Sequence, residues 1–234
     1  MIPLHDDNPT RTTPVLTIGI IAACILMFLW QSSLGEQAGM IAVHALGLIP
    51  AVLLRKVELH PDIAVIAPPL TLVTSMFLHG GFMHLAGNML YLWIFGNNIE
   101  DTLGHGRFAL FYLLCGLAAA GGQILRDPGS EIPMIGASGA ISGVLGAYLV
   151  LFPRARVLVA IPLGFYLHMV RLPAAGVLGL WFVLQVVSSM LAGDGPGVAW
   201  YAHIGGFIAG LLLVLVLRRR GTPLWRPARP PGPW

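Results

Sequence analysis

Three short polar motifs lie within otherwise apolar stretches of the sequence, and their side chains are of the types that hydrolytic chemistry uses. The first places His84 four residues before Asn88, the second places Ser138 two residues after Gly136, and the third contains His203. Polar groups in apolar surroundings cost free energy that packing alone does not recover, so they are a guide to function. We interpret the three motifs as parts of one site.

Ser138 and His203 are a candidate nucleophile and general base. A serine hydroxyl is a weak nucleophile until a base accepts its proton, and a neutral histidine, with a pKa of about 6.5, suits that task. None of the ten acidic residues falls in the same part of the predicted helices, so we expect a dyad without a carboxylate. The backbone N–H of Ser138 and the side chains of His84 and Asn88 could stabilise an oxyanion. Gly136 allows a sharp turn before the serine and close approach of a substrate backbone.

The composition indicates that these groups lie in a membrane protein. Charged residues make up 10% of the chain, hydrophobic residues make up 56%, and the mean hydropathy is +0.81, whereas soluble domains are about one-quarter charged. The net charge of +3 sits mostly in an Arg-rich C-terminal segment, so nucleic acid is not an expected partner. The two cysteines fall inside apolar runs with no metal-ligand spacing between them, so the sequence indicates neither a disulfide framework nor a zinc site.

The apolar stretches predict an all-α polytopic bundle, because crossing the hydrocarbon core takes about 20 residues. The six predicted spans are residues 14–32, 81–99, 107–125, 137–153, 173–192 and 199–217. They divide the chain into an N-terminal tail (1–13), a membrane domain (14–217) and a Pro/Arg-rich tail (218–234). Within the membrane domain, residues 33–80 form a long outer-face loop that is partly embedded. Gly, Ala and Ser in the second, fourth and sixth spans favour close helix packing.

The distribution of positive charge predicts that both termini are cytoplasmic. All Lys and Arg residues except Arg55, Lys56 and Arg126 fall on one side of a six-span topology, and basic residues of short loops are retained in the cytoplasm. The second, fourth and sixth spans then run inward from the outer face. Their polar motifs would meet in the outer third of the bundle, in a site that opens to the outer side.

The three motifs together resemble the rhomboid intramembrane proteases. The resemblance covers roughly Leu70 to Leu217 and rests on His-x-x-x-Asn, Gly-x-Ser-Gly and Ala-His-x-x-Gly-x-x-x-Gly in the family's order. It implies a six-helix core, a cofactor-free dyad of Ser138 and His203, and an oxyanion hole that includes His84 and Asn88. It also implies cleavage of the transmembrane segments of other proteins, in an integral protein of a bacterial plasma membrane. His79 matches a further family histidine near the mouth of the cavity.

The sequence departs from the family pattern at two places. The family's first loop commonly carries a Trp-Arg pair shortly before the second span, where this chain has Pro69-Leu-Thr-Leu-Val-Thr-Ser75. Many relatives place an aromatic residue four positions after the serine, beneath the histidine ring, where this chain has Ser142. The hydroxyl of Ser142 would form a hydrogen bond instead of stacking.

Three other interpretations compete with a protease. A zinc site of His79, His84 and His203 is disfavoured because the sequence has no His-Glu-x-x-His and no neighbouring carboxylate base. A protein that binds transmembrane helices without cleaving them, as inactive rhomboid relatives do, would typically lack the serine or the histidine. A transporter would show paired repeats and a polar path through the midplane, and neither is visible. The sequence makes no prediction of the oligomeric state.

Overall fold

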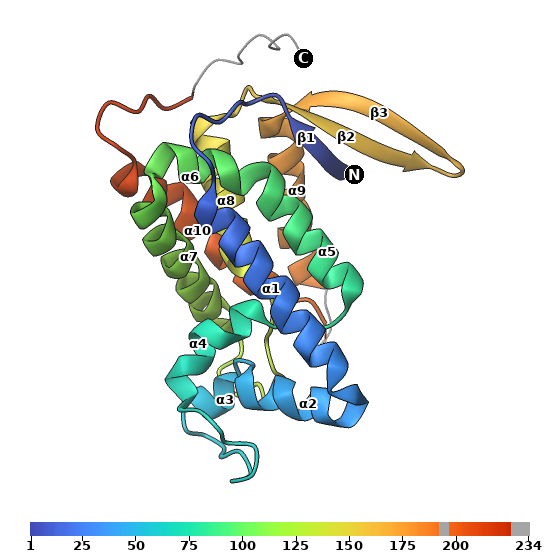
Figure 1. Cartoon of the computed structure of the whole chain (residues 1–234), viewed down its shortest axis with the longest axis vertical. Helices are drawn as coiled ribbons and strands as arrows, with labels where there is room; N and C mark the ends of the chain where they lie inside the picture. Colours follow the sequence, from blue (N-terminus) through green and yellow to red (C-terminus); the bar gives the residue numbers. More distant parts are fainter. Residues whose placement is uncertain (192–196, 226–234) are drawn as a thin grey trace.

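The chain folds as a bundle of helices with a small sheet at one end (Figure 1), in a computed structural model that describes residues 1–191 and 197–225. The helices of the bundle are α1 (Val15–Ser33), α5 (Phe82–Tyr91), α6 (Asn97–Leu103), α7 (His105–Arg126), α8 (Ser138–Leu151), α9 (Ala174–Leu191) and α10 (Trp200–Leu217). A π-helical turn, η3 (Leu92–Gly96), joins α5 to α6. The end of the fifth predicted span, residue 192, and residues 226–234 of the predicted C-terminal tail lie outside the described residues.

Four helices among the described residues, α1, α7, α9 and α10, are long and apolar enough to cross a bilayer. They correspond to four of the six predicted spans. The fourth predicted span is α8, which is apolar but has only 14 residues, or about 21 Å at a rise of 1.5 Å per residue. The second predicted span is the helical run of α5, η3 and α6. The chain is therefore an integral membrane protein with four helices of spanning length.

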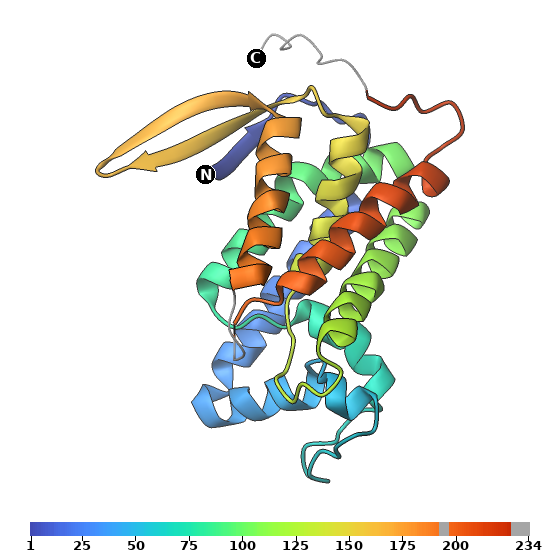
Figure 2. The ribbon, with the colours of Figure 1, turned by 180° about the vertical axis from the view of Figure 1, so that it is seen from behind.

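The long connection between α1 and α5 lies at the end of the bundle where α5, α8 and α10 begin (Figures 1 and 2). Its elements are α2 (Gly35–Leu46), α3 (Pro50–Leu53), η1 (Pro68–Leu70), α4 (Thr71–Thr74) and η2 (Ser75–Phe77). None of them has the length of a span. Leu48 and Met134 exchange backbone hydrogen bonds of 3.0 and 2.8 Å. This connection therefore holds the loop that leads into α8.

The all-α prediction is wrong in one respect, because the described residues include a three-stranded antiparallel sheet in the order β1–β2–β3. Strand β1 (Ile2–Asp6) lies within the predicted N-terminal tail, and β2 (Arg156–Leu163) and β3 (Tyr166–Pro173) form a hairpin between α8 and α9. The turn of the hairpin uses Gly164 with a φ of +62°, a conformation that glycine adopts without strain. A short apolar run does not by itself distinguish strand from helix, and the partner strands decide it here.

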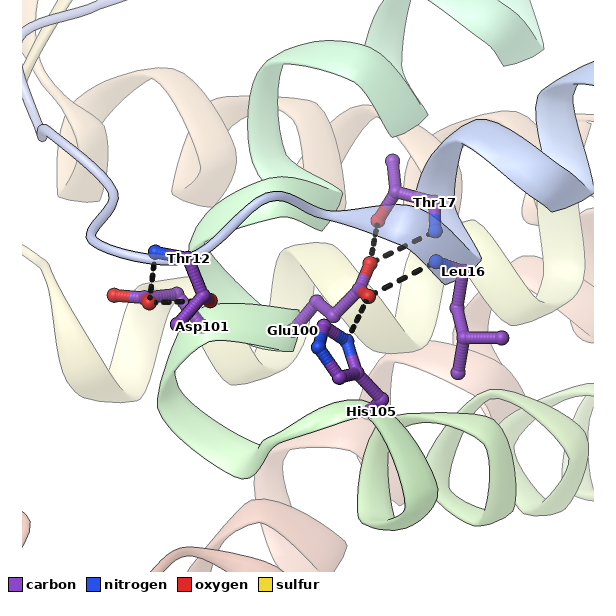
Figure 3. A network of polar contacts seen from close by, with 6 residues as sticks. All are labelled: Thr12, Leu16, Thr17, Glu100, Asp101 and His105. Atoms are coloured by element: carbon purple, nitrogen blue, oxygen red, sulfur yellow. Dashed lines mark hydrogen bonds and ion pairs between the residues drawn. The ribbon is translucent and has the colours of Figure 1, made fainter.

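The sheet end of the bundle is fixed by buried carboxylates. Glu100 of α6 accepts hydrogen bonds from the backbone N–H of Leu16 and of Thr17, from the Thr17 hydroxyl, and from Nδ1 of His105 (Figure 3), with distances from 2.6 to 2.9 Å. A negative charge at the first turn of α1 satisfies unpaired backbone donors and interacts favourably with the helix dipole. Asp101 binds Thr12 beside it. Glu100 thus locks the start of α1 onto the corner between α6 and α7.

Helices α8 and α10 pack so closely that no side chain fits at Gly206 or Gly210. A Cβ atom added at Gly206 would collide with the backbone carbonyl of Gly139, and one added at Gly210 would collide with that of Gly143. The sequence predicts these small-residue faces, and the structure confirms that they lie against each other. Close backbone approach of this kind is typical of membrane helix pairs.

The first testable prediction concerns this contact. We expect Gly210→Ala to lower the free energy of unfolding by about 1–3 kcal/mol, because the added methyl group forces the two backbones apart. Titration of the detergent-solubilised protein with sodium dodecyl sulfate measures the change. Gly176→Ala in α9 is the matched control, since a Cβ there meets no atom within 4 Å. Equal stability of the two variants would contradict the prediction.

A second prediction follows from Asp6 in β1, which is 5% exposed and accepts hydrogen bonds from the hydroxyl of Tyr148 and the amide of Asn98. Burial raises the pKa of Asp6 from 3.8 to about 7, against a smaller opposing effect of the Tyr148 hydrogen bond. The folded chain thus holds this proton more tightly than the unfolded chain. The contribution of Asp6 to stability is full below pH 3.8 and decreases as the pH rises toward 7.

We therefore expect stability to fall by roughly 2 kcal/mol between pH 5 and pH 7 through this group. The same detergent titration, repeated across that range, measures the fall. Asp6→Asn should flatten the dependence, because the amide cannot ionise. Glu36→Gln, a change at an exposed position in α2, is the control and should leave the slope unchanged. An identical slope in the wild type and Asp6→Asn would show that another group is responsible.

Candidate active site

Ser138 is the first residue of α8, at the point where an extended loop turns into the helix. Gly136 makes this turn with a φ of +122°, in the left-handed region that disfavours other residues. The backbone N–H of Gly136 donates a hydrogen bond of 2.9 Å to the carbonyl of Ser75, at the start of η2 in the long connection. The loop thereby delivers Ser138 at the N-terminus of the helix, and the residue is half-buried.

His203 lies one turn into α10 and meets Ser138 directly. The distance between Nε2 of His203 and Oγ of Ser138 is 2.8 Å, within hydrogen-bonding range. The two residues are 65 positions apart in the sequence. The glycine contacts between α8 and α10 bring them together, because any larger spacing of the two backbones would separate the side chains. The arrangement pairs a hydroxyl with an imidazole that can accept its proton.

The ring of His203 has further contacts that the sequence did not predict. Oε1 of Gln185 in α9 lies 2.7 Å from Nδ1 of His203, and Trp181 and Trp200 have ring centroids 6.0 and 6.1 Å from the imidazole. The only signal for Gln185 in the sequence is a polar side chain within an apolar span. Ser142 donates its hydroxyl hydrogen bond to the carbonyl of Ser138 at 2.6 Å. The hydroxyl of Ser142 therefore forms a hydrogen bond, as expected, and its partner is a backbone carbonyl.

His84 faces the turn at Gly136. A Cβ atom at Gly136 would lie 2.7 Å from Nε2 of His84 and 3.7 Å from Oγ of Ser138, so the missing side chain leaves space between the two groups. Nδ1 of His84 accepts a hydrogen bond of 3.3 Å from the backbone N–H of Gly80. A neutral imidazole that accepts at Nδ1 carries its proton on Nε2. His84 therefore presents an N–H donor toward the space beside Ser138.

Asn88 lies one turn further along α5 and is buried at 7% exposure. Its Nδ2 has no hydrogen-bond partner among the described residues. Buried amide groups normally have partners, so this donor is available to a ligand or to water. The sequence prediction that His84 and Asn88 lie on one helix, four residues apart, agrees with the structure.

His79 precedes α5 and supports the ring of His84. The two ring centroids are 5.1 Å apart in an edge-to-face arrangement. The backbone N–H of His79 donates to Oε1 of Gln31 in α1 at 3.1 Å, and Nδ1 of His79 contacts the carbonyl of Phe77 at 3.2 Å. Burial, and to a smaller extent the neighbouring His84, lower the pKa of His79 to about 4. His79 is therefore neutral at physiological pH.

A cavity of about 730 Å³ is lined by four of the five predicted site residues, Ser138, His203, His84 and Gly136, whereas Asn88 is not among its lining residues. Loop residues 130–136, the end of α7 and the start of α10 form its walls. The size is that of a site for part of a peptide chain, since ligand pockets are about 300–1,000 Å³. Within residues 1–191 and 197–225, no three His, Cys, Asp or Glu side chains gather as a metal site.

The sequence of this chain matches a known protein family over most of its length. The family model for the Rhomboid domain matches residues 68–220. The chain belongs to the rhomboid family. The resemblance inferred from the three motifs is thereby confirmed, and the matched segment contains all five predicted site residues. Residues 1–67, with β1, α1, α2 and α3, precede the matched segment.

Several rhomboid relatives are about one-third identical to this chain. RHOMBOID-like protein 5 of Arabidopsis thaliana is 33% identical over 64% of this chain and 44% of its own length. Rhomboid protein 1, mitochondrial, of Saccharomyces cerevisiae is 31% identical over 61% of this chain and 40% of its own. Rhomboid protease GluP of Bacillus subtilis is 35% identical over 62% of this chain and 25% of its own. The chain thus spans less than half the length of each of these relatives.

A third prediction follows from the turn at Gly136. We expect Gly136→Ala to lower the free energy of unfolding by about 1–3 kcal/mol, because the backbone conformation is unfavourable for alanine and the methyl group would press on His84. Titration with dodecyl sulfate again measures the change. Gly87→Ala in α5 is the control, because its Cβ would meet no atom within 4 Å. Unchanged stability of Gly136→Ala would show that the turn is not constrained as described.

Proposed function

We propose that this chain is an intramembrane serine endopeptidase that cleaves peptide bonds in or near the transmembrane segments of other membrane proteins. The observation that carries the proposal is the 2.8 Å contact between Oγ of Ser138 and Nε2 of His203 at the floor of a cavity. Membership of the rhomboid family supports it, as does the 35% identity to a relative named as a protease. The chemistry uses the protein's own side chains and no cofactor.

In this proposal Ser138 attacks the carbonyl carbon of the scissile peptide bond while His203 accepts the hydroxyl proton. His203 then donates that proton to the leaving amine, which breaks the C–N bond and leaves an acyl group on Ser138. Water attacks the carbonyl carbon of the acyl-enzyme while His203 accepts its proton. His203 then returns this proton to Oγ of Ser138 as the ester C–O bond breaks, which releases the acid product and restores the free serine. The hydrogen bond between the two side chains is the geometry that this sequence of steps requires.

Three donors are proposed to stabilise the oxyanion of the tetrahedral intermediate: the backbone N–H of Ser138, the Nε2–H of His84 and the Nδ2–H of Asn88. The open space beside Gly136 supports the assignment of His84, because a carbonyl oxygen there would lie near both Ser138 and His84. The unpartnered amide supports that of Asn88. Loss of one such donor typically costs about 3–4 kcal/mol of barrier stabilisation.

The full proposal includes six spans with both termini in the cytoplasm and the cavity facing the opposite side. Its support is the continuous helical run through α5, η3 and α6, the apolar α8, and the distribution of positive charge. The short α8 would keep Ser138 below the membrane surface. We place the chain in a bacterial plasma membrane, with the Bacillus relative as support. The yeast relative is named as mitochondrial. Expression of the fluorescently tagged protein in bacterial and in yeast cells, followed by microscopy, tests which membrane it enters.

The fourth prediction tests the nucleophile and the base. A fluorophosphonate reagent should label the purified wild type, and Ser138→Ala should abolish labelling. His203→Ala should slow labelling by about a thousandfold or more, because the hydroxyl loses its proton acceptor. His168→Ala on the exposed strand β3 should label at the wild-type rate. Labelling of Ser138→Ala would reject the assignment of the nucleophile.

Co-expression with a panel of single-span membrane proteins tests the substrate class. Cleavage of at least one of them by the wild type, and of none by Ser138→Ala, is the expected result. Immunoblots of both substrate termini locate the cut relative to the membrane. Cleavage that persists in Ser138→Ala would assign the activity to another protease in the host cell.

A further inference from the structure

Gln185 on α9 contacts the proposed base from the side opposite the serine. Its Oε1 atom lies 2.7 Å from Nδ1 of His203, while Nε2 of the same ring lies 2.8 Å from Oγ of Ser138. The glutamine is 8% exposed, so its amide does not exchange this partner freely with water. Three side chains from α8, α10 and α9 therefore form a continuous chain of hydrogen bonds.

The orientation of the Gln185 amide determines where the proton of His203 lies. Nε2 of Gln185 donates to the backbone carbonyl of Trp181 at 3.5 Å, and a carbonyl can only accept. This contact favours the orientation in which Oε1 faces His203, and since an amide oxygen can only accept, Nδ1 of His203 is then the donor. The proton of the neutral ring is thus on Nδ1. The lone pair of Nε2 points to Ser138, which is the form that a general base requires.

We propose that Gln185 is a positioning residue that holds His203 in its Nδ1–H tautomer and fixes the plane of the ring, a role that rests on the proposed serine protease function. It occupies the place that a carboxylate takes in a Ser-His-Asp triad, where the third group orients the histidine. The amide performs the orienting part of that role and leaves the ring without a neighbouring negative charge.

The membrane surroundings explain why an amide can stand at this position. Gln185 lies in the C-terminal half of α9, a helix of spanning length. An ionised carboxylate at such a depth is costly, whereas a neutral amide with both ends hydrogen-bonded is tolerated. The ring of Trp181, one turn earlier on the same helix, has its centroid 6.0 Å from that of the imidazole, and the two ring planes are tilted by 36°. Helix α9 thus places two side chains, Gln185 and Trp181, beside the ring of His203.

A purely structural role for Gln185 makes different predictions. If the amide only joined α9 to α10, its replacement would change stability but not the distribution of the His203 proton between the two nitrogens. Gln185→Met keeps the length of the side chain and removes both hydrogen-bonding groups. Gln185→Glu keeps the acceptor toward Nδ1 and adds a charge. Leu184→Met, at an exposed position next in sequence, is the matched control.

The fifth prediction concerns the tautomer of His203, which NMR of protein labelled with ¹⁵N-histidine reports. The His203 signals are assigned as those that disappear in His203→Gln. We expect the Nδ1–H form in the wild type, in Leu184→Met and in Gln185→Glu, and a mixture of the two tautomers in Gln185→Met. An Nε2–H ring in the wild type would overturn the proposal, as would an unchanged Nδ1–H ring in Gln185→Met. This measurement needs no substrate.

The second readout is the rate of labelling by the fluorophosphonate as a function of pH. Gln185→Met should label roughly tenfold more slowly than the wild type or worse, as expected for the loss of one buried hydrogen bond. Gln185→Glu should restore the rate at high pH and move the acidic limb of the profile upward by roughly one pH unit, because a carboxylate favours the protonated ring. Equal slowing in Gln185→Met and Gln185→Glu at every pH would indicate packing and overturn the proposal.

The two readouts separate this proposal from the one on which it rests. A wild-type protein that is not labelled at all would reject the serine protease assignment, whereas the tautomer measurement would still report whether Gln185 controls His203. A labelled wild type with a normal rate in Gln185→Met would leave the protease assignment intact and reject the role of Gln185.

Discussion

The contact between the backbones of α8 and α10 is the constraint on which the site depends. The two helix backbones are so close that a methyl group added at Gly206 or Gly210 of α10 would collide with the backbone carbonyl of Gly139 or Gly143 of α8. Ser138 and His203 lie at the same end of this contact and are joined by a hydrogen bond of 2.8 Å. In a bilayer, where lipid offers as apolar an environment as another helix, close packing of small residues is a main source of such association.

Two histidines beside that contact, His84 and His203, carry their protons on opposite ring nitrogens. His84 accepts from the backbone of Gly80 at Nδ1 and so exposes an N–H at Nε2. His203 faces the oxygen of Gln185 at Nδ1 and so exposes a lone pair at Nε2. One ring is therefore a donor and the other an acceptor, on two sides of the same serine. Each tautomer is fixed by the group bound to the other nitrogen, which is a general property of histidine sites.

The opposite end of the bundle has no part in this chemistry but limits how the helices can move. Glu100 binds the first turn of α1, and Asp6 joins β1 to α6 and α8 through Asn98 and Tyr148. Both carboxyl groups are buried, with hydrogen bonds to several donors, which is the condition under which such groups are tolerated. The short helix α8 is thus held in place at its C-terminal end, which is the end remote from Ser138.

The sequence by itself determined the membrane class, the positions of the helices and the identity of the family, because these follow from apolar length, from small-residue faces and from three motifs in a fixed order. It placed Ser138, His203, His84, Asn88 and Gly136 in one region. The pairing of β1 with β2 and the hydrogen bonds from the start of α1 to Glu100 could not be predicted, because each joins residues more than 80 positions apart. Only the tertiary structure decided that Gln185 faces His203, because a single polar residue on an apolar helix can point to lipid or to the core. Its direction is set by packing against a neighbouring helix, which no local pattern of residues encodes.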